Sequence, residues 1–271
     1  MTAGNAVPGE GVQCEHCAVR SRALCASAGH EGQRELRRWS RIRRVAADET
    51  VLPEHGESGF VGTVVAGALR QVKTMPDGRE QVVGLVFPGE FFGRPFRART
   101  DFGYEAAIDS EICVTERLAF EAVLRRHPEV EHQLLLQTMN ELAAARERSL
   151  LLGSLDTLER VATYLLVMSA RREQMLSRIG QDPRLEVAAS LISRRDLASY
   201  LGTTIETISR HVHHLSRGGV IRIIDSSHFE VLDHQRLLAI SGVTHDDLRL
   251  FDVVGESAAA EPGHARPAGA A

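Results

Sequence analysis

Two short helical segments joined at a glycine, near residues 193–217, constrain the fold of this chain more than any other feature. Ser193 is a good N-cap for the first segment, Gly202 supplies a tight turn, and Thr203 or Thr204 can cap the second. Such a pair predicts a helix-turn-helix. Its small core is expected to hold the apolar positions of both segments, which are Leu197, Leu201, Ile205, Ile208, Val212 and Leu215.

The second of these helices carries a polar outer face. Glu206, Ser209, Arg210 and His213 recur at spacings of three and four residues, so they share one side of the helix. Rigidly held polar groups of this kind suit the major groove of DNA, where arginine can bind guanine O6 and N7 and glutamate can accept from a cytosine amine. We therefore predict that these four residues, together with Thr204, contact double-stranded DNA.

The surroundings of the helix pair favour the same interpretation. Residues 220–224 and 228–232 are short apolar stretches around a polar turn, which predicts a β-hairpin wing. The whole chain has a net charge of −4, yet residues 184–222 carry six arginines and three acidic residues. A basic patch on an acidic chain is typical of a DNA-facing surface. A helix pair that only packs against its neighbours is the alternative.

Between about residues 34 and 119, short apolar stretches alternate with turn signals, which predicts antiparallel strands in a roll or barrel. Asp77-Gly78 lies between two of these stretches and predicts the clearest hairpin. The stretches are 60–65, 68–72, 81–87 and 108–114.

A long helix is expected next, because residues 129–152 contain neither Gly nor Pro and are rich in helix-forming residues. A second helix over 158–172 follows, with Asp156 as its cap. Steps of seven along the long helix predict a soft coiled-coil seam for a homodimer, and packing on its own domain is the alternative. The seam would hold Leu135, Thr138, Leu142, Ala145, Ser149 and Leu152.

The motif R-D-L-A-S-Y-L-G at 195–202, followed by T-I-E-T-I-S-R at 204–210, resembles the recognition motif of winged-helix regulators of the CRP/FNR superfamily. The run P-G-E-F-F-G at 88–93 resembles part of the sensory roll of that superfamily. In the FNR branch, an E-x-x-S-R pattern implies homodimer binding to palindromes with TTGAT-like half-sites. Glu206, Ser209 and Arg210 match this pattern one for one.

This resemblance spans about residues 14–242 and implies an α+β fold. Its parts would be a cysteine-containing arm at 1–33, an N-terminal antiparallel β-roll (cupin-like) sensory domain at 34–127, a dimerisation helix at 128–153 and a C-terminal winged helix-turn-helix domain at 154–242. Residues 243–271 are rich in Ala, Gly and Pro, and we expect a disordered tail there.

The cysteines suggest the input signal. Cys14, Cys17 and Cys25 form a C-x2-C-x7-C pattern, and Cys113 lies on an expected strand. Thiols in a reducing compartment are more often metal ligands or redox groups than disulfides. The arrangement is similar to the 4Fe-4S site of FNR-type oxygen sensors, although the third interval is longer than the usual five residues. The resemblance implies a regulator that binds DNA at low oxygen, when its cluster is intact.

Other inputs remain alternatives, namely haem-bound nitric oxide and direct thiol oxidation, as do a zinc site with His16 or His30 and plain buried thiols. Superfamily members that bind cyclic nucleotide carry a Gly-Glu pair and an Arg-Ser or Arg-Thr pair. Here Gly93 is followed by Arg94-Pro95, and the place of the phosphate-binding pair falls near Asp101-Phe102. Arg99-Thr100 is the only local substitute and lies slightly too early. We expect no cyclic nucleotide, because an aspartate would repel the phosphate.

The remaining expectations concern partners and location. No nucleotide-cradling glycine motif, zinc-protease motif or nucleophile elbow occurs, so an enzyme is not expected, and a redox adaptor that does not bind DNA is a further alternative. Without a membrane-length apolar run or a signal sequence, we expect a cytoplasmic protein.

The turn at 74–80 resembles the family surface that touches RNA polymerase, with Asp77 and Arg79 as candidates. Ala145 occupies a position that is often acidic in FNR proteins, so the switch could be dimerisation or reorientation of a permanent dimer.

Overall fold

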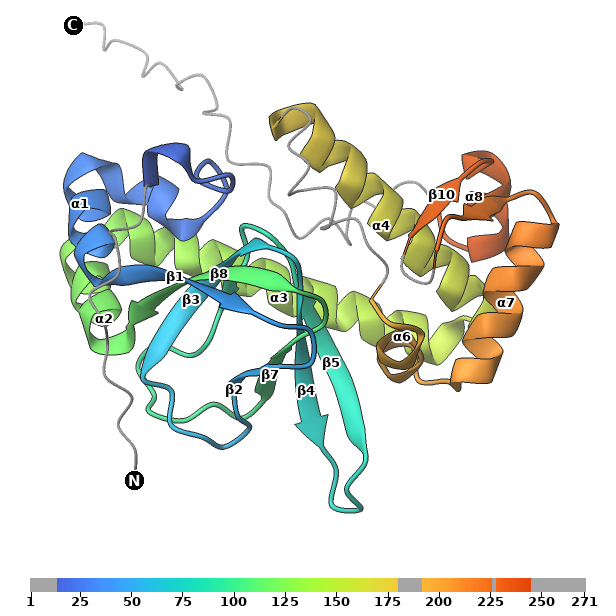
Figure 1. Ribbon diagram of the computed structural model, residues 1–271, viewed down its shortest axis with the longest axis horizontal. Helices are drawn as coiled ribbons and strands as arrows, with labels where there is room; N and C mark the ends of the chain where they lie inside the picture. The colour runs from blue at the N-terminus through green and yellow to red at the C-terminus, as the bar shows by residue number, and fades with distance from the viewer. Residues whose placement is uncertain (1–13, 180–191, 226–227, 245–271) are drawn as a thin grey trace, which may run out of the picture.

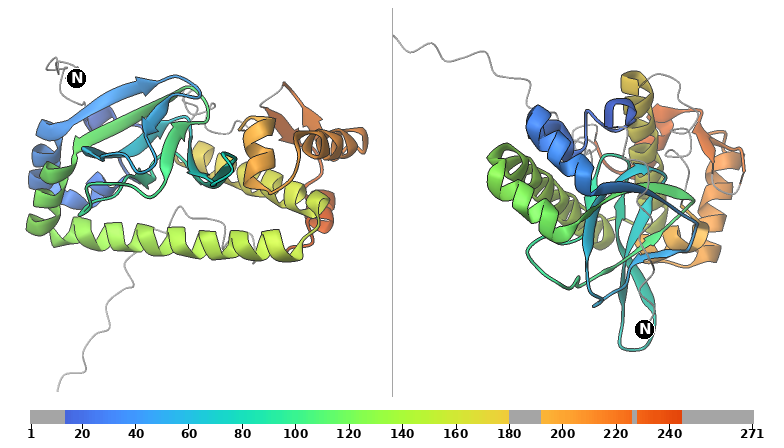
Figure 2. Two further views of the ribbon diagram at one scale, coloured as in Figure 1. Left: turned by 90° about the horizontal axis from the view of Figure 1, so that it is seen from below. Right: turned by 60° about the vertical axis from the view of Figure 1, so that its left-hand side comes forward.

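The computed structural model describes residues 14–179, 192–225 and 228–244. A β-roll with helices at one end lies beside a smaller unit of helices and a β-hairpin (Figure 1). One long helix runs along both parts, as the left view of Figure 2 shows. The predicted tail lies outside the described residues from position 245 onward, as does the turn of the predicted wing at 226–227.

The N-terminal arm is more helical than predicted. The 3-10 helix η1 (Cys14–His16) comes first, and η2 (Leu24–Ala28) leads directly into α1 (Gly29–Trp39), so the expected boundary at residue 33 falls inside a helix. The sequence pattern missed α1 because it buries only two residues, Gly32 and Leu36. A side chain at Gly32 would collide with Ala28 and the His127 ring, so glycine permits this close packing.

The roll consists of two four-stranded antiparallel sheets with the orders β1-β8-β3-β6 and β2-β7-β4-β5. Buried side chains such as Leu69, Phe92 and Ile112 fill the space between them. The predicted hairpin is confirmed: β4 and β5 pair with Lys73 opposite Gln81, and Gly78 in the turn has φ +82°. The strands are β1 (Ser40–Val45), β2 (Thr50–Leu52), β3 (Phe60–Ala66), β4 (Leu69–Thr74), β5 (Glu80–Val86), β6 (Phe91–Phe92), β7 (Gly103–Ala106) and β8 (Ser110–Glu116).

Three helices follow the roll: α2 (Arg117–Arg126), α3 (Pro128–Ser154) and α4 (Thr157–Ile179). The long helix was predicted, and Gly153 lies inside it rather than ending it. Asp156 caps α4 as expected, since its Oδ1 accepts hydrogen bonds from the amides of Leu158 and Glu159 at 2.7 and 2.9 Å. No helix among the described residues is both long and apolar enough to cross a bilayer.

The C-terminal unit is the predicted winged helix-turn-helix. Ser193 caps the first helix by accepting from Asp196 N at 3.1 Å, and Gly202 turns the chain with φ +64°. One core prediction was wrong, because Ile205 is 44% exposed: it begins the second helix directly after the cap, and this first turn faces outward. The elements are α6 (Arg194–Tyr200), α7 (Ile205–Arg217), β9 (Ile221–Ile223), β10 (Phe229–Val231) and α8 (His234–Ser241).

Candidate functional site

The predicted DNA-contacting residues lie together on α7. Glu206, Arg210 and His213 are exposed, and Ser209 is partly exposed between them. Thr204 is exposed as well, but its hydroxyl accepts a hydrogen bond from Thr207 N at 3.3 Å and so caps α7. We call Thr204, Glu206, Ser209, Arg210 and His213 the reading face. A rigid helix therefore presents an acceptor, a hydroxyl and a guanidinium within two turns of its N-terminal end.

Two reading-face groups are held by neighbours. Hydrogen bonds from its own backbone amide and from Thr204 lower the pKa of Glu206, so this side chain stays an acceptor-only carboxylate. Nη1 of Arg194, on α6, donates to Oγ of Ser209 at 3.1 Å, which leaves the serine O–H free to donate elsewhere. Sequence reasoning missed Arg194, because nothing in a local pattern pairs a residue with one 15 positions away.

The four cysteines line one cavity of about 60 Å³. Cys14 belongs to η1, Cys17 follows it, Cys25 belongs to η2, and Cys113 lies in the middle of β8. Apolar side chains form much of the remaining wall, namely Val19, Ala23, Leu36, Val61, Val65, Phe91 and Phe120. Three of the thiols thus come from the arm, and the fourth comes from the roll.

The thiols of this cavity affect one another electrostatically. Burial, with a smaller contribution from the neighbouring cysteines, raises the pKa of Cys25 to about 11 and that of Cys113 to about 12. Burial also raises the pKa of Cys14, while Arg37 and Arg20 act in the opposite direction. Four thiolates in this cavity would repel one another. The cysteines therefore stay protonated unless bound cations offset the negative charge.

The described residues can be compared with a site for a single metal ion. Within the described ranges, no three His, Cys, Asp or Glu side chains converge closely enough to hold one ion. Tetrahedral zinc with Zn–S bonds of about 2.3 Å requires such close convergence. His16 and His30 are exposed and do not line the cavity, so the geometry gives no support to the histidine-containing zinc alternative.

The predicted dimer seam lies on the exposed side of α3. Leu142 is 51% exposed, and the hydroxyls of Thr138 and Ser149 bond to carbonyls of their own helix. Leu135 and Ala145 are exposed too, whereas Leu152 is partly buried near Gly202. Three further apolar side chains are exposed on this helix, and the seam prediction missed them: Leu136, Met139 and Leu150. A single chain thus leaves an apolar stripe uncovered on a helix that spans both domains.

Two other predicted sites lie on the surface of the roll. At the tip of the β4–β5 hairpin, Nε of Arg79 donates to Oδ2 of Asp77 at 2.7 Å, and both side chains are largely exposed. The two residues that were compared with the nucleotide-binding pattern contact each other: Arg94 forms an ion pair with Asp101. The Thr100 hydroxyl bonds to the backbone of Phe102.

Known proteins match both halves of the chain. Residues 159–240 fit the family profile of the Crp-like helix-turn-helix domain, and residues 42–127 fit that of the cyclic nucleotide-binding domain. The chain is 36% identical to the transcriptional activator protein FnrL of Cereibacter sphaeroides, over 86% of this chain and 94% of that protein. It is 32% identical to the nitrogen fixation regulation protein FixK of Bradyrhizobium diazoefficiens, over 84% and 93%. The structure of FixK2 from Bradyrhizobium japonicum superposes with a TM-score of 0.65 and 30% identity, covering 76% of this chain and 98% of that one.

Proposed function

Because the chain belongs to the CRP/FNR family of transcription regulators, we propose that it is an oxygen-responsive member whose four cysteines hold a 4Fe-4S cluster. The chain is a DNA-binding transcription activator of the FNR/FixK type and not an enzyme. The proposal concerns the signal that the protein senses.

The single observation that carries the proposal is the shared cavity of Cys14, Cys17, Cys25 and Cys113. Four thiolates are the ligand set that a 4Fe-4S cluster prefers, each binding a different iron. Much of the wall is apolar, and Arg20 and Arg37 offset negative charge near Cys14.

The residues of the chain would act as follows. Cys113 is fixed in a central strand of the roll, paired with Ile42 on one side and Thr63 on the other. Shared ligation with the cysteines of η1 and η2 would tie the arm to the roll. η2 in turn packs against α3, the helix with the uncovered apolar stripe. When bound, the cluster supplies an oxygen-labile link at this point.

On the output side, the proposed form is a homodimer on palindromic TTGAT-type sites. Family members are dimers, and an apolar stripe on α3 suits a two-fold partner. Two copies of α7 would then enter major grooves one DNA turn apart. RNA polymerase is the proposed further partner, through Asp77 and Arg79 on the exposed hairpin tip.

Cyclic nucleotide is not the proposed signal, although residues 42–127 fit the cyclic nucleotide-binding profile. Nucleotide-binding members place an acid after the glycine and an arginine at the phosphate position. This chain has Arg94 after Gly93 and an acid at Asp101, and these two pair with each other. Both charges are thus reversed relative to the nucleotide-binding pattern.

The decisive experiment is purification without air, followed by iron and sulfide analysis and DNA binding before and after exposure to oxygen. We expect four irons and four sulfides per chain, a broad visible absorbance, and binding to the palindrome that is lost in air. A colourless protein without iron would contradict the cluster proposal. An intense Soret band would indicate haem, and oxygen-dependent DNA binding without metal would indicate a thiol switch.

A further inference from the structure

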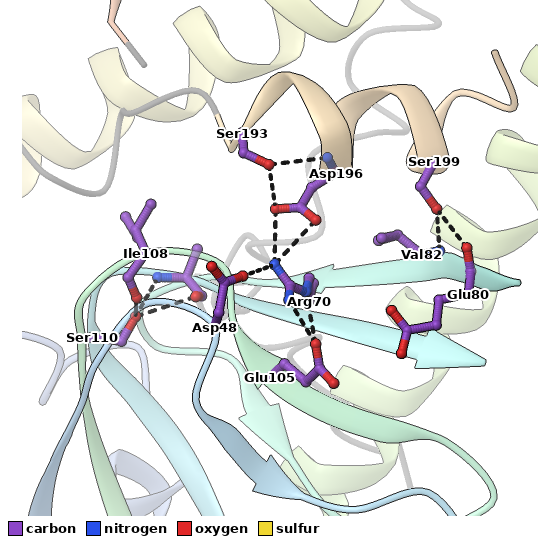
Figure 3. A network of polar contacts seen from close by, with 11 residues as sticks. Asp48, Arg70, Glu80, Val82, Glu105, Ile108, Ser110, Ser193, Asp196 and Ser199 are labelled. Carbon is purple, nitrogen blue, oxygen red and sulfur yellow. Dashed lines mark hydrogen bonds and ion pairs between the residues drawn. The ribbon is translucent and has the colours of Figure 1, made fainter. Parts of the chain in front are cut away.

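The β4–β5 hairpin of the roll contacts the first helix of the DNA-binding unit, α6 (Figure 3). Nη1 of Arg70, on β4, donates to both carboxylate oxygens of Asp196 at 3.1 and 3.0 Å. The two residues are 8% and 5% exposed. This buried ion pair joins the two domains through residues that are 126 positions apart in the chain.

A second set of bonds joins the same two elements. β5 is an edge strand, so half of its backbone groups have no partner within the sheet. Oγ of Ser199, on α6, accepts from Val82 N at 2.9 Å and donates to Glu80 O at 3.2 Å. Arg148 of α3 donates to Val82 O at 3.1 Å, and its guanidinium lies 5.2 Å from the centre of the Tyr200 ring. α6 and α3 thus cover the open edge of the sheet.

Further hydrogen bonds and ion pairs within the roll hold the hairpin and Arg70 in place. At its base, Oγ of Ser110 accepts from Ala68 N at 3.0 Å and donates to Ile108 O at 2.7 Å. Arg70 is also held by Glu105 at 2.7 Å and by Asp48 at 2.8 Å, as Figure 3 shows. Burial lowers the pKa of Arg70, but the three carboxylates more than offset this effect, so the group stays charged.

The contact can also open without leaving a buried charge alone. If α6 moves away, Arg70 keeps Glu105 and Asp48, while Asp196 becomes solvated and keeps its bonds to Ser193. Reversible separation is therefore physically accessible, whereas a pair with no other partners would strand a charge on separation.

The docked arrangement leaves the reading face open. Arg194, at the start of α6, bonds to Ser209, so this end of α6 lies beside the reading face. There the first helix of such a motif approaches the phosphate backbone. Because Arg70 is shared with Glu105 and Asp48, its ion pair with Asp196 offsets part of a negative charge that would otherwise repel phosphates at this end of α6.

We propose that Arg70 and Asp196 are positioning residues for DNA binding: together with the Ser199 bonds to β5, they hold α6 against the roll and so fix α7 in the orientation that a dimer needs on a palindrome. A domain held in place binds with a smaller entropy loss than a freely tethered one. The proposal depends on DNA binding by this family and not on the cluster or on any oxygen response.

The test compares full-length variants on a palindromic TTGAT duplex at fixed salt: Arg70→Met, Asp196→Asn and the double variant. Arg70→Met leaves Asp196 negative and undocked, and we expect about tenfold weaker binding, or about 1.4 kcal/mol. Asp196→Asn removes the repulsion and should lose less, about threefold. Since each substitution breaks the same contact, the double variant should bind no more weakly than Arg70→Met.

Hydrogen exchange at Val82 supplies a readout that a loss of overall stability does not mimic. Its amide is protected by Ser199, so we expect exchange about tenfold faster in all three variants and in Ser199→Ala, while amides of Ile208 and Val212 in α7 keep their protection. The matched control is Arg44→Met, which breaks an ion pair of 2.8 Å elsewhere on the roll and should change neither measurement.

Three results would overturn the proposal. Tight DNA binding despite rapid exchange at Val82 would show that the docked arrangement is unnecessary or inhibitory. Unchanged Val82 exchange in Arg70→Met would show that the ion pair does not hold the contact. Fully additive losses in the double variant would show that the two residues act separately.

Discussion

Nη1 of Arg194 lies 3.1 Å from Oγ of Ser209, joining the first helix of the DNA-binding unit to the middle of the reading face. This bond comes from α6 and fixes the direction of the Ser209 hydroxyl group. Arg194→Ala should therefore weaken binding to the palindrome by about 1 kcal/mol, roughly fivefold, because the hydroxyl loses its fixed direction.

The salt dependence of affinity separates this role from a phosphate contact. An orienting arginine should leave the slope of log affinity against log salt unchanged, whereas a lost phosphate contact lowers it by about one unit. Arg217→Ala is the control, since Arg217 is exposed and bonds only within α7 among the contacts described. A reduced slope in Arg194→Ala would contradict the orienting role.

Arg210→Ala tests base reading on the exposed side of α7. A bidentate arginine–guanine contact discriminates by about 1–3 kcal/mol, so affinity for the palindrome should fall by that amount and selectivity should relax at one base pair. Competition with point-substituted duplexes measures this. An equal loss on random DNA would contradict base reading.

Cys113→Ser tests the proposed cluster at the one ligand that the roll contributes. A serine hydroxyl is a poor iron ligand, so iron and sulfide content after anaerobic purification should fall strongly. Thr63→Val is the matched control, because Thr63 lines the same cavity opposite Cys113 without a thiol. Equal iron content in all three proteins would remove Cys113 from the ligand set.

Leu142→Asp tests the stripe on α3. Because Leu142 is 51% exposed in a single chain, the substitution should leave the fold of the monomer intact, but it would bury a charge in a dimer and should abolish dimerisation. Sedimentation measures the dimer fraction. Leu118→Asp is the matched control, because Leu118 is 58% exposed on α2, outside the stripe, and this variant should remain dimeric.

The same measurement on wild-type protein with and without air decides how the switch works. Equal dimer fractions in both conditions would exclude dimerisation as the switch. A permanent dimer that reorients its DNA-binding units would then be the form of the proposed oxygen response, in keeping with Ala145 at the position that the resemblance leads us to expect as acidic.

Asp77→Ala and Arg79→Ala address the hairpin tip. The two side chains pair with each other on an exposed turn, so their loss should cost little stability. We expect unchanged DNA affinity with reduced transcription in a purified system with RNA polymerase. Unchanged transcription would exclude this contact.

Features that depend on neighbours in the chain could be predicted from the sequence. The caps at Ser193 and Asp156, the turn at Gly202 and the hairpin at Gly78 are local, because each is set by backbone preferences within about four residues. Ile205 was misplaced because its apolar character fits the pattern of the core, whereas its position directly after the cap turns it outward.

The sequence by itself determined the winged helix-turn-helix, the strand-rich roll, the long helix and the identity of the four thiols, since periodicity, turn residues and motif spacing encode them. The grouping of Cys113 with the three thiols of the arm was expected from the resemblance, and the packed structure brings all four to one cavity. Only the tertiary structure decided that Arg194 supports Ser209 and that Arg70 reaches Asp196. These contacts join residues far apart in the chain. Their partners follow from how the sheets, α3 and α6 pack, which no local preference specifies.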